Sequence, residues 1–418
     1  MRTGTIWAAL LAVVAGLLCG CGTADNRITP TADLPAVKAL PRALASQGLV
    51  LYWTGQWPLE KNESVARINV QPGRLYAVTN RNRLIAMDSR TGQFLWDADL
   101  GSPGLSVTPV CHVGGNLAVV AVLDQLFGFD VTTGRRVLKV ALERAPSTKL
   151  VCRGEFIYFG TNDGWLEAVN VANGSKNWSR WTEAAILAAP AVDEHGVYLA
   201  NSAGNLTSNS FKKRFINWTY PQGGRIGSVV ADLSVSSGEM GLILVPSRDY
   251  SLYAMNSLGG QPAWICTTGE PLSKAAHSFA DQIYFVSETN VLFCVKESGP
   301  GPGDKPLWTA NGIDNFVAAS PTAVYVLSKF QPAGGTVTAL NPQTGKVKFH
   351  VPTGGLNLIV PNDLDGQLFA ADNAGHILCL REATGLYDLK PAIQETPAAL
   401  PPPVKKSAKP AADAEPKK

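Results

Sequence analysis

Short apolar runs alternate with polar turns along most of the chain. In the first complete unit, residues 75–79, 84–88 and 94–98 are strand-like runs, and Gly, Asn and Asp residues stand between them. Short strands that are divided by such turns predict antiparallel hairpins. Between residues 50 and 390 no stretch has a helical period with capping residues. The pattern therefore predicts an all-β protein.

One spacing recurs through these runs. At residues 86–96 a strand ends in Ala-Met-Asp, a Thr-Gly turn follows, and Trp96 stands eight residues after Asp88. The same arrangement returns from the following anchor positions: 88, 130, 170, 210, 256, 296, 341 and 381. The copy at 296 is four residues longer, and the copy at 381 breaks off after Gly385. A period of about 42 residues with strand-like segments indicates a radial or solenoid repeat.

Four short strands in one such period are the content of a propeller blade. The repeats predict an eight-bladed β-propeller of four-stranded antiparallel blades, but the eighth repeat lacks its outer strand. Residues 49–53 have a strand pattern, and Trp53 lies 43 residues before Trp96, in step with the repeat. We therefore predict that this N-terminal segment pairs with residues 377–381 and closes the ring, which removes free sheet edges.

A large aromatic residue recurs on the predicted outer strand, where it can cover the seam to the next blade. We interpret this series as structural: Trp53, Trp96, Trp178, Trp218, Trp264 and Trp308. The Gly of each Thr-Gly turn is predicted to supply the positive φ that a hairpin turn requires.

The Ala-x-Asp-x-x-Thr-Gly-x-x-x-Trp arrangement, over residues 48–390, resembles the repeat of the quinoprotein (PQQ-type) β-propellers. Two branches share this repeat. One comprises the large periplasmic quinoprotein alcohol dehydrogenases, and the other comprises the non-enzymatic lipoproteins of the BamB type in the outer-membrane β-barrel assembly machine. The chain is most like the second branch, although the repeat alone fits both.

Resemblance to the dehydrogenases would imply a quinone pocket, a Ca²⁺ ion, an Asp base and a disulfide between adjacent cysteines. The predicted mature chain has no Cys-Cys pair, and the enzymes are much longer. Lys149, Arg225 and Lys274 could meet a polar ligand at one mouth of the ring. Mostly apolar segments are expected to line the hub: 105–107, 149–151, 186–188, 227–229, 274–276, 316–318 and 358–360. We therefore predict no catalytic residue, no metal ligand and no cofactor.

The N-terminus has the pattern of a bacterial lipoprotein signal. An apolar run from Ile6 to Leu18 precedes Leu18-Cys19-Gly20-Cys21, which resembles a lipobox. We predict a signal peptide at 1–20 and acylation of Cys21, with an ordinary secretory signal as the alternative. Two or more acyl chains anchor a protein stably to a membrane. Gly22 favours the outer membrane, and the inner membrane stays open.

Composition divides the rest of the chain. Residues 21–46 are polar and contain several prolines, which predicts a flexible tether, and residues 47–389 hold the propeller repeats. Residues 390–418 are rich in Pro, Ala and Lys, which predicts a disordered tail. This tail could contact anionic headgroups or peptidoglycan, or it could simply be solvated.

The net charge of +3 over 418 residues gives no indication of a nucleic-acid partner. Cys111 and Cys152 occupy matching places in successive repeats. They could form a disulfide across a seam, or they could lie too far apart, as matching positions in neighbouring blades often do. Cys294 and Cys379 lie in apolar strands and are predicted to be buried thiols.

These features predict a non-catalytic, lipid-anchored scaffold that binds envelope proteins through its loops. The resemblance implies a place on the periplasmic face of the outer membrane, with the barrel-insertion protein and barrel precursors as partners. No motif identifies the partner-binding residues. The alternatives are a subunit of another envelope complex, a polysaccharide binder and, ranked last, a PQQ-dependent oxidoreductase.

Overall fold

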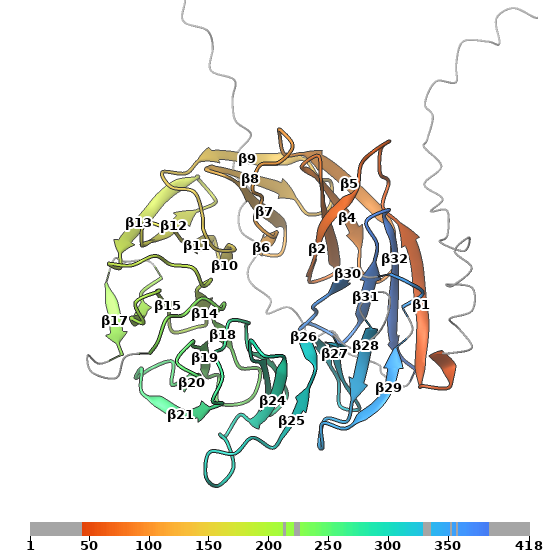
Figure 1. Ribbon diagram of the computed structural model, residues 1–418. Helices are drawn as coiled ribbons and strands as arrows, with labels where there is room; N and C mark the ends of the chain where they lie inside the picture. The colour runs from red at the N-terminus through yellow and green to blue at the C-terminus, as the bar shows by residue number, and fades with distance from the viewer. Residues whose placement is uncertain are drawn as a thin grey trace, which may run out of the picture.

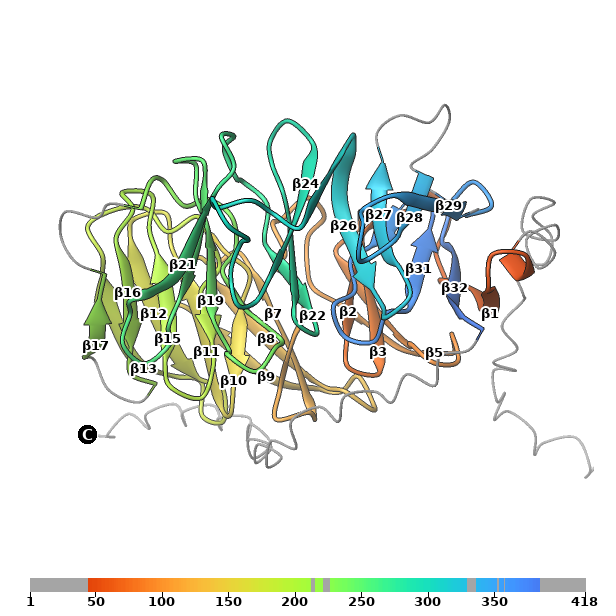
Figure 2. The same ribbon diagram turned by 90° about the horizontal axis from the view of Figure 1, so that it is seen from below.

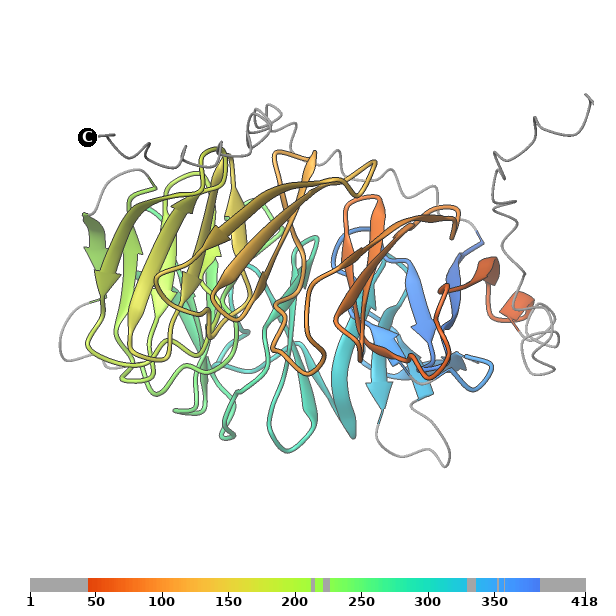
Figure 3. The ribbon, with the colours of Figure 1, turned by 90° about the horizontal axis from the view of Figure 1, so that it is seen from above.

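A computed structural model describes residues 44–211, 215–220, 226–328, 336–351, 353–356 and 358–383. Their strands form eight four-stranded antiparallel sheets, which are arranged as blades around a central axis (Figure 1). Side views show the blades side by side in a thick disc (Figures 2 and 3). The predicted all-β, eight-bladed propeller is confirmed. No helix in these ranges is long and apolar enough to cross a membrane.

The strands of each blade run from the hub outwards in chain order, except in the last blade. Blade 1 contains β2 (Val65–Gln71), β3 (Arg74–Thr79), β4 (Arg83–Asp88) and β5 (Phe94–Asp99), and blade 2 contains β6 (Cys111–Val113), β7 (Leu117–Val122), β8 (Gln125–Asp130) and β9 (Arg136–Ala141). Blade 3 contains β10 (Val151–Arg153), β11 (Phe156–Gly160), β12 (Trp165–Asn170) and β13 (Ser175–Trp181), and blade 4 contains β14 (Ala191–Val192), β15 (Val197–Ala200), β16 (Leu206–Asn209) and β17 (Ile216–Thr219).

Blades 5 to 8 complete the ring, and the last of them takes its outer strand from the N-terminus. Blade 5 contains β18 (Ser234–Val235), β19 (Ile243–Pro246), β20 (Ser251–Met255) and β21 (Pro262–Thr267), and blade 6 contains β22 (His277–Phe279), β23 (Gln282–Val286), β24 (Val291–Lys296) and β25 (Trp308–Asn311). Blade 7 contains β26 (Ile313–Ala319), β27 (Val324–Ser328), β28 (Thr336–Leu340) and β29 (Val347–Val351), and blade 8 contains β30 (Leu358–Val360), β31 (Leu368–Ala371), β32 (His376–Glu382) and β1 (Leu49–Gln56).

The burial of each strand follows from its place in the blade. The second strands are mostly buried, and β7 is buried at every residue, because each blade is covered on both faces by its neighbours. In the outer strand β9, by contrast, Leu138 is the one buried residue. The core therefore consists of apolar layers between successive blades, and one such layer joins Tyr76 and Trp96 of blade 1 to Phe129 of blade 2.

The inner strands differ in part from the sequence prediction. Residues 316–318 lie inside β26 and residues 358–360 form β30, as expected. The other inner strands begin later than predicted, and the apolar runs at 105–107, 186–188, 227–229 and 274–276 precede β6, β14, β18 and β22. These runs belong to the crossings from an outer strand to the next hub position, where Val107 makes only an isolated bridge with Val122. Apolar content alone therefore did not separate a buried crossing from a strand.

The predicted closure of the ring is confirmed. β1 pairs antiparallel with β32 from Leu49 opposite Glu382 to Gln56 opposite His376, and the sheet order is β1-β32-β31-β30. In Figure 1 the two ends of the colour range meet in this sheet. The amide of Ala383 donates to the Gly48 carbonyl at 2.8 Å, which continues the pairing beyond the strands.

The packed body begins slightly before the predicted boundary at residue 47. Leu44 is fully buried and belongs to the same apolar cluster as Leu49, Tyr325 and Leu378, at the seam between blades 7 and 8. Leu44 therefore packs against the propeller, although the sequence assigned it to the tether. Cys21, the signal segment and residues 390–418 lie outside the described residues.

The segment after β1 also ties the N-terminal strand to blade 1. Trp57 is buried, and its amide donates to the Gly375 carbonyl at 2.8 Å. Glu63 forms an ion pair with Arg83 at 2.6 Å. Burial alone would raise the pKa of Glu63, but hydrogen bonds from Arg83 and from the amide of Glu60 outweigh it and hold the pKa at about 2. This carboxylate is thus ionised in the folded protein at neutral pH.

Deleting residues 22–43 should leave the thermal unfolding temperature unchanged, whereas deleting residues 22–56 should lower it and cause aggregation. The longer deletion removes the buried Leu44 and Leu49, each worth roughly 2–5 kcal/mol, and exposes the edge of β32. Differential scanning calorimetry of both proteins and the complete chain measures this. Equal unfolding temperatures for all three would show that β1 does not close the ring.

Candidate functional site: blade seams and hub

The repeated Asp-x-x-Thr-Gly sequence forms one turn geometry. The Asp88 carboxylate accepts hydrogen bonds from the amides of Arg90 and Thr91, both at 2.9 Å, and the Gly92 amide donates to the Asp88 carbonyl at 2.9 Å. Gly92 has φ 70°. A short carboxylate side chain that satisfies the amides of its own turn explains the Asp, and the left-handed backbone explains the Gly.

Each tryptophan of the series lies at the seam between its blade and the next. Its indole Nε1–H donates to a backbone carbonyl on the following blade, one residue after the repeat anchor. The pairs are Trp53 with Ser89 (3.0 Å), Trp96 with Val131 (2.9 Å), Trp178 with Phe211 (3.0 Å), Trp218 with Ser257 (2.8 Å), Trp264 with Glu297 (2.7 Å) and Trp308 with Pro342 (2.8 Å). The hydrogen bond fixes the ring against the neighbouring turn, because a buried indole N–H needs an acceptor.

The turn glycine is also the surface on which the indole rests. A Cβ atom placed on Gly134 would lie 2.5 Å from Cγ of Trp96, closer than real side chains approach. The same holds for Gly92 beneath Trp53, and for Gly345 beneath Trp308. These turns therefore need glycine both for the backbone conformation and for the space that the indole occupies.

A tyrosine on the second strand accompanies several of these tryptophans, and the sequence analysis missed it. The ring centroids lie 5.9 Å apart for Tyr76 and Trp96, and 6.1 Å apart for Tyr158 and Trp178. Each of these tyrosines precedes its tryptophan by 20 residues. That spacing could have identified the series, because it recurs with the same period as the anchors.

Two buried carboxylates also bridge seams, one between blades 7 and 8 and one between blades 5 and 6. Glu382 accepts hydrogen bonds from Ser320 Oγ at 2.5 Å and from Tyr325 Oη at 2.8 Å, so it joins blade 8 to blade 7. Glu297 stands at the matching position of blade 6 and is bonded by Ser236 of blade 5. Nothing in the local sequence distinguishes these two glutamates, because their partners are distant along the chain. Ser320 lies 62 residues before Glu382, and Ser236 lies 61 residues before Glu297.

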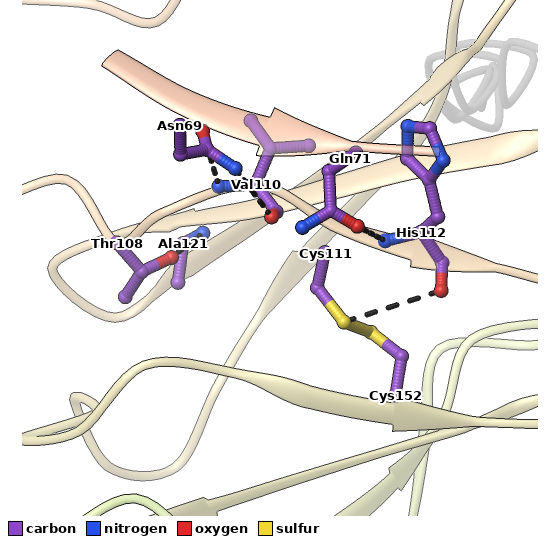
Figure 4. The surroundings of a disulfide bond; sticks show 8 residues. All are labelled: Asn69, Gln71, Thr108, Val110, Cys111, His112, Ala121 and Cys152. Carbon is purple, nitrogen blue, oxygen red and sulfur yellow. Dashed lines mark hydrogen bonds between the residues drawn. A yellow bond between two sulfur atoms is a disulfide. The ribbon is translucent and has the colours of Figure 1, made fainter. Parts of the chain in front are cut away.

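Near the hub, a disulfide joins the inner strands of blades 2 and 3 (Figure 4). Cys111 of β6 and Cys152 of β10 are bonded, with their Cα atoms 6.2 Å apart. Beside it, Asn69 of β2 donates to the Val110 carbonyl at 3.1 Å, and the His112 amide donates to Gln71 at 3.3 Å. Covalent and hydrogen bonds thus hold three successive inner strands together, which settles the alternatives left open by the sequence.

The remaining described cysteines are buried. The predicted burial of Cys294 and Cys379 is confirmed, and Cys266 is buried as well. Burial raises the pKa of Cys266 to about 11, and it raises the pKa of the other two thiols as well. A thiol with a raised pKa is protonated at neutral pH and is a weak nucleophile.

The charged groups near the hub form separate pairs. Lys149 pairs with Asp232 at 3.0 Å, and Lys274 pairs with Asp314 at 3.5 Å. Each lysine is thus paired with a different aspartate, and Arg225 lies outside the described residues. His277 Nδ1 lies 2.9 Å from the Asp363 carboxylate.

The His277–Asp363 pair spans blade 7 from blade 6 to blade 8. The imidazole stacks on Phe316 of β26, with the ring centroids 4.5 Å apart. The neighbouring His277 helps to lower the pKa of Asp363. The pair thus holds the turn after β30 against the hub.

The described residues do not fit the quinone and Ca²⁺ site of the dehydrogenase branch. The disulfide joins cysteines that are 41 residues apart rather than adjacent ones. Asp232 and Asp363 are already paired with Lys149 and His277. In the described ranges, no group of three or more His, Cys, Asp or Glu residues could hold a metal ion.

The Gly134→Ala substitution should cost roughly 2–5 kcal/mol of unfolding free energy, because a left-handed Ala costs about 1–2 kcal/mol and overpacking adds about 1–3 kcal/mol. Gly73→Ala is the matched control, since Gly73 has φ 71° but no atom within 4 Å of its added Cβ. It should cost only the backbone part, about 1–2 kcal/mol. Urea denaturation measures both, and equal losses would contradict the contact with Trp96.

Replacing Cys111 and Cys152 by Ser should cost about 4 kcal/mol, the loop entropy of a bridge across a separation of 41 residues. Each single substitution should cost as much as the double one, because either removes the same bond. The natural chain in a strong reductant should show the same loss of unfolding free energy as these variants. Additive losses in denaturant titrations would argue against the disulfide.

Comparison with known proteins supports the same family resemblance. The family model described as "Outer membrane protein assembly factor BamB" matches residues 50–243. A curated protein of that name from Xanthomonas campestris pv. campestris is 26% identical over 160 residues. The match covers 37% of this chain and 38% of that protein, so it spans well under half of either.

Solved structures share the fold at low identity. BamB from Moraxella catarrhalis has a TM-score of 0.63 and 16% identity, covering 81% of this chain and 98% of that one. The designed Ika8 protein has a TM-score of 0.60 and 14% identity, covering 76% of this chain and 96% of that one. Sqt1 from Saccharomyces cerevisiae has a TM-score of 0.59 and 12% identity, covering 78% of this chain and 97% of that one. At such identities the likeness shows the fold alone. The fold and the sequence matches together confirm the predicted resemblance: the chain carries a PQQ-like β-propeller and is similar to the outer membrane protein assembly factor BamB.

Proposed function

We propose that the protein is a non-catalytic, lipid-anchored scaffold on the periplasmic face of the outer membrane, where it assists the assembly of β-barrel proteins. The observation that carries this proposal is the BamB family match over residues 50–243, which contains all of blades 1 to 4. Its partners are the barrel-insertion protein and incoming barrel precursors. Nucleic acid has no part in this role.

The seams give the scaffold the rigidity that this role requires. At six of the eight seams a buried or half-buried indole donates a hydrogen bond to the next blade, so the turns there are presented at fixed positions. Binding surfaces on loops gain affinity when the underlying body is rigid, because less freedom is lost on binding. The function therefore needs the fold only as a support for its loops.

Exposed aromatic side chains mark one face as a candidate for partner contact. Trp181, at the end of β13, is 55% exposed, and Tyr250, in the turn between β19 and β20, is 50% exposed. Both lie on the face formed by the second-to-third strand turns and by the crossings between blades. Tryptophan and tyrosine are enriched where proteins bind tightly, because they bury a large area with few rotatable bonds.

Acylation of Cys21 supplies the anchor in this proposal. The 23 residues from Cys21 to residue 43 can span at most about 80 Å when fully extended. The propeller can therefore stay close to the bilayer while its loops reach membrane-embedded partners. Two or more acyl chains hold a protein at a membrane far more stably than one chain does.

A pair of cysteine substitutions tests the anchor and the role together. Cys21→Ser should abolish incorporation of labelled fatty acid and release the protein from the membrane, whereas Cys19→Ser should retain both. Crosslinking in intact envelopes with the natural chain should recover the barrel-insertion protein. Cells that lack the protein should contain less assembled outer-membrane β-barrel protein.

Other outcomes would replace parts of the proposal. Label that persists in Cys21→Ser would contradict acylation at that residue. Recovery of a different envelope complex, or of polysaccharide, with normal barrel levels would assign the scaffold to that assembly. Quinone-dependent oxidation of an alcohol by the purified protein would contradict a non-catalytic role.

A further inference from the structure

The turns from the third to the fourth strand carry a run of basic side chains on neighbouring blades. Antiparallel strands place all of these turns on one face of the propeller. On blades 7, 1 and 2, either side of blade 8, the bases are Lys346, Lys348, Arg90, Arg135 and Arg136, which we call the basic arc. All five are exposed. In Figure 1, β29, β1, β5 and β9 follow one another along this part of the rim.

The acidic residues near the basic arc do not cancel its charge. Asp88 and Asp130 lie in the same turns and accept hydrogen bonds from backbone amides there. These bonds leave both carboxylates charged, so the two acids offset only two of the five positive charges of the basic arc. The first-to-second strand turns of blades 1, 2 and 7, at residues 72–73, 114–116 and 320–323, contain no acid. On blade 8 the corresponding turn contains Asp363, which is paired with His277, and Asp365, so the four acids of the sector are still fewer than the five bases of the arc. This sector of the face is therefore net positive.

Two bases on the opposite face form ion pairs. Arg81 pairs with Glu60 at 2.9 Å, and Arg248 pairs with Glu288 at 3.2 Å. In contrast, among the residues that the structure describes, no ion pair is found for Arg90, Arg135 or Lys346. Exposed bases without an ion pair therefore lie together in this sector, and a local field of one sign favours an anionic partner.

Apolar side chains lie beside these bases. Val347 stands between Lys346 and Lys348 and is 57% exposed. On the neighbouring β1, Tyr52 is 39% exposed, with the Arg381 guanidinium 3.6 Å from the centre of its ring. Exposed apolar and aromatic groups among bases suit a bilayer interface, where phosphates face the bases and the apolar groups enter the headgroup layer.

Both ends of the described chain leave from blade 8, in the middle of the basic arc. The start of β1 at Leu49 pairs with Glu382, and Gly48 is bonded to Ala383. The segment toward Cys21 therefore departs from the same face as the bases. An acyl anchor on that segment would hold this side, rather than the opposite face, close to lipid.

We propose that the basic arc, with Val347 and Tyr52, is a membrane-facing surface that binds anionic phospholipid headgroups and orients the propeller. This deepens the proposed function and rests on it, because the acyl anchor supplies the proximity. Trp181 and Tyr250 then point away from the bilayer toward soluble domains of partners. Each Lys or Arg near an anionic surface contributes about fivefold in affinity at moderate salt.

Vesicle binding by the unacylated full chain, with Cys21→Ser, tests this orientation. It should bind vesicles of equal parts phosphatidylcholine and phosphatidylglycerol, fail to bind pure phosphatidylcholine, and dissociate as salt is raised. Adding Arg90→Gln, Arg135→Gln and Lys346→Gln should weaken binding on the order of a hundredfold, the product of three such factors.

A matched variant removes the same charge from the opposite face. Lys61→Gln, Arg81→Gln and Arg248→Gln should leave the affinity for the anionic vesicles within about threefold of the parent, because those positions lie away from the bilayer. Unfolding temperatures close to the parent's establish that both triple variants are folded. The measurement is cosedimentation over a range of lipid concentrations.

Four results would overturn the assignment. Equal losses from the two triple variants would mean that only net charge matters. No binding to the anionic vesicles, or full binding by the arc variant, would exclude the basic arc as a lipid surface. Loss of partner crosslinks in the arc variant without vesicle binding would assign the arc to an acidic protein. None of these results depends on acylation or on barrel assembly, so the proposed function is tested separately.

Discussion

The contact between an outer-strand indole and the glycine turn of the next blade determines how the sheets are held. The indole lies against a turn that has no Cβ, and its N–H donates to the backbone beside that turn, as Trp96 does to Val131 above Gly134. An apolar surface is buried and a polar group is satisfied in the same place. Six of the eight seams share this contact, so each of those blades depends on the next one for the burial of its outer strand.

A ring built from such contacts stays open at one point unless its two ends are joined. β1 provides that join by pairing with β32, and Trp53 of β1 then makes the same seam contact with Gly92 of blade 1. The disulfide between β6 and β10 adds a covalent link near the hub, where the inner strands are short. Closure and the disulfide therefore act at the outer and inner ends of the blades, respectively.

The two faces of the propeller differ in whether their charged side chains form ion pairs or face solvent. Several acids and bases around the hub and on the crossing face are paired, as Lys149 is with Asp232 and Arg248 is with Glu288, and they hold loops in place. The third-to-fourth strand turns repeat the same Asp-x-x-Thr-Gly chemistry and leave their variable positions free, so basic residues there face solvent. A repeat that fixes the backbone of a turn thus leaves its exposed positions open to binding.

The sequence by itself determined the all-β class, the number of blades, the strand that closes the ring and the place of Trp96 and its equivalents, because periodic burial and turn chemistry are local properties. The tertiary structure decided what depends on distances between repeats. It brought Cys111 to Cys152 and Ser320 to Glu382, separated the ion pairs of Lys149 and Lys274, and moved several inner strands past the predicted apolar runs. These outcomes follow from the angle and spacing of neighbouring blades, which no single repeat encodes.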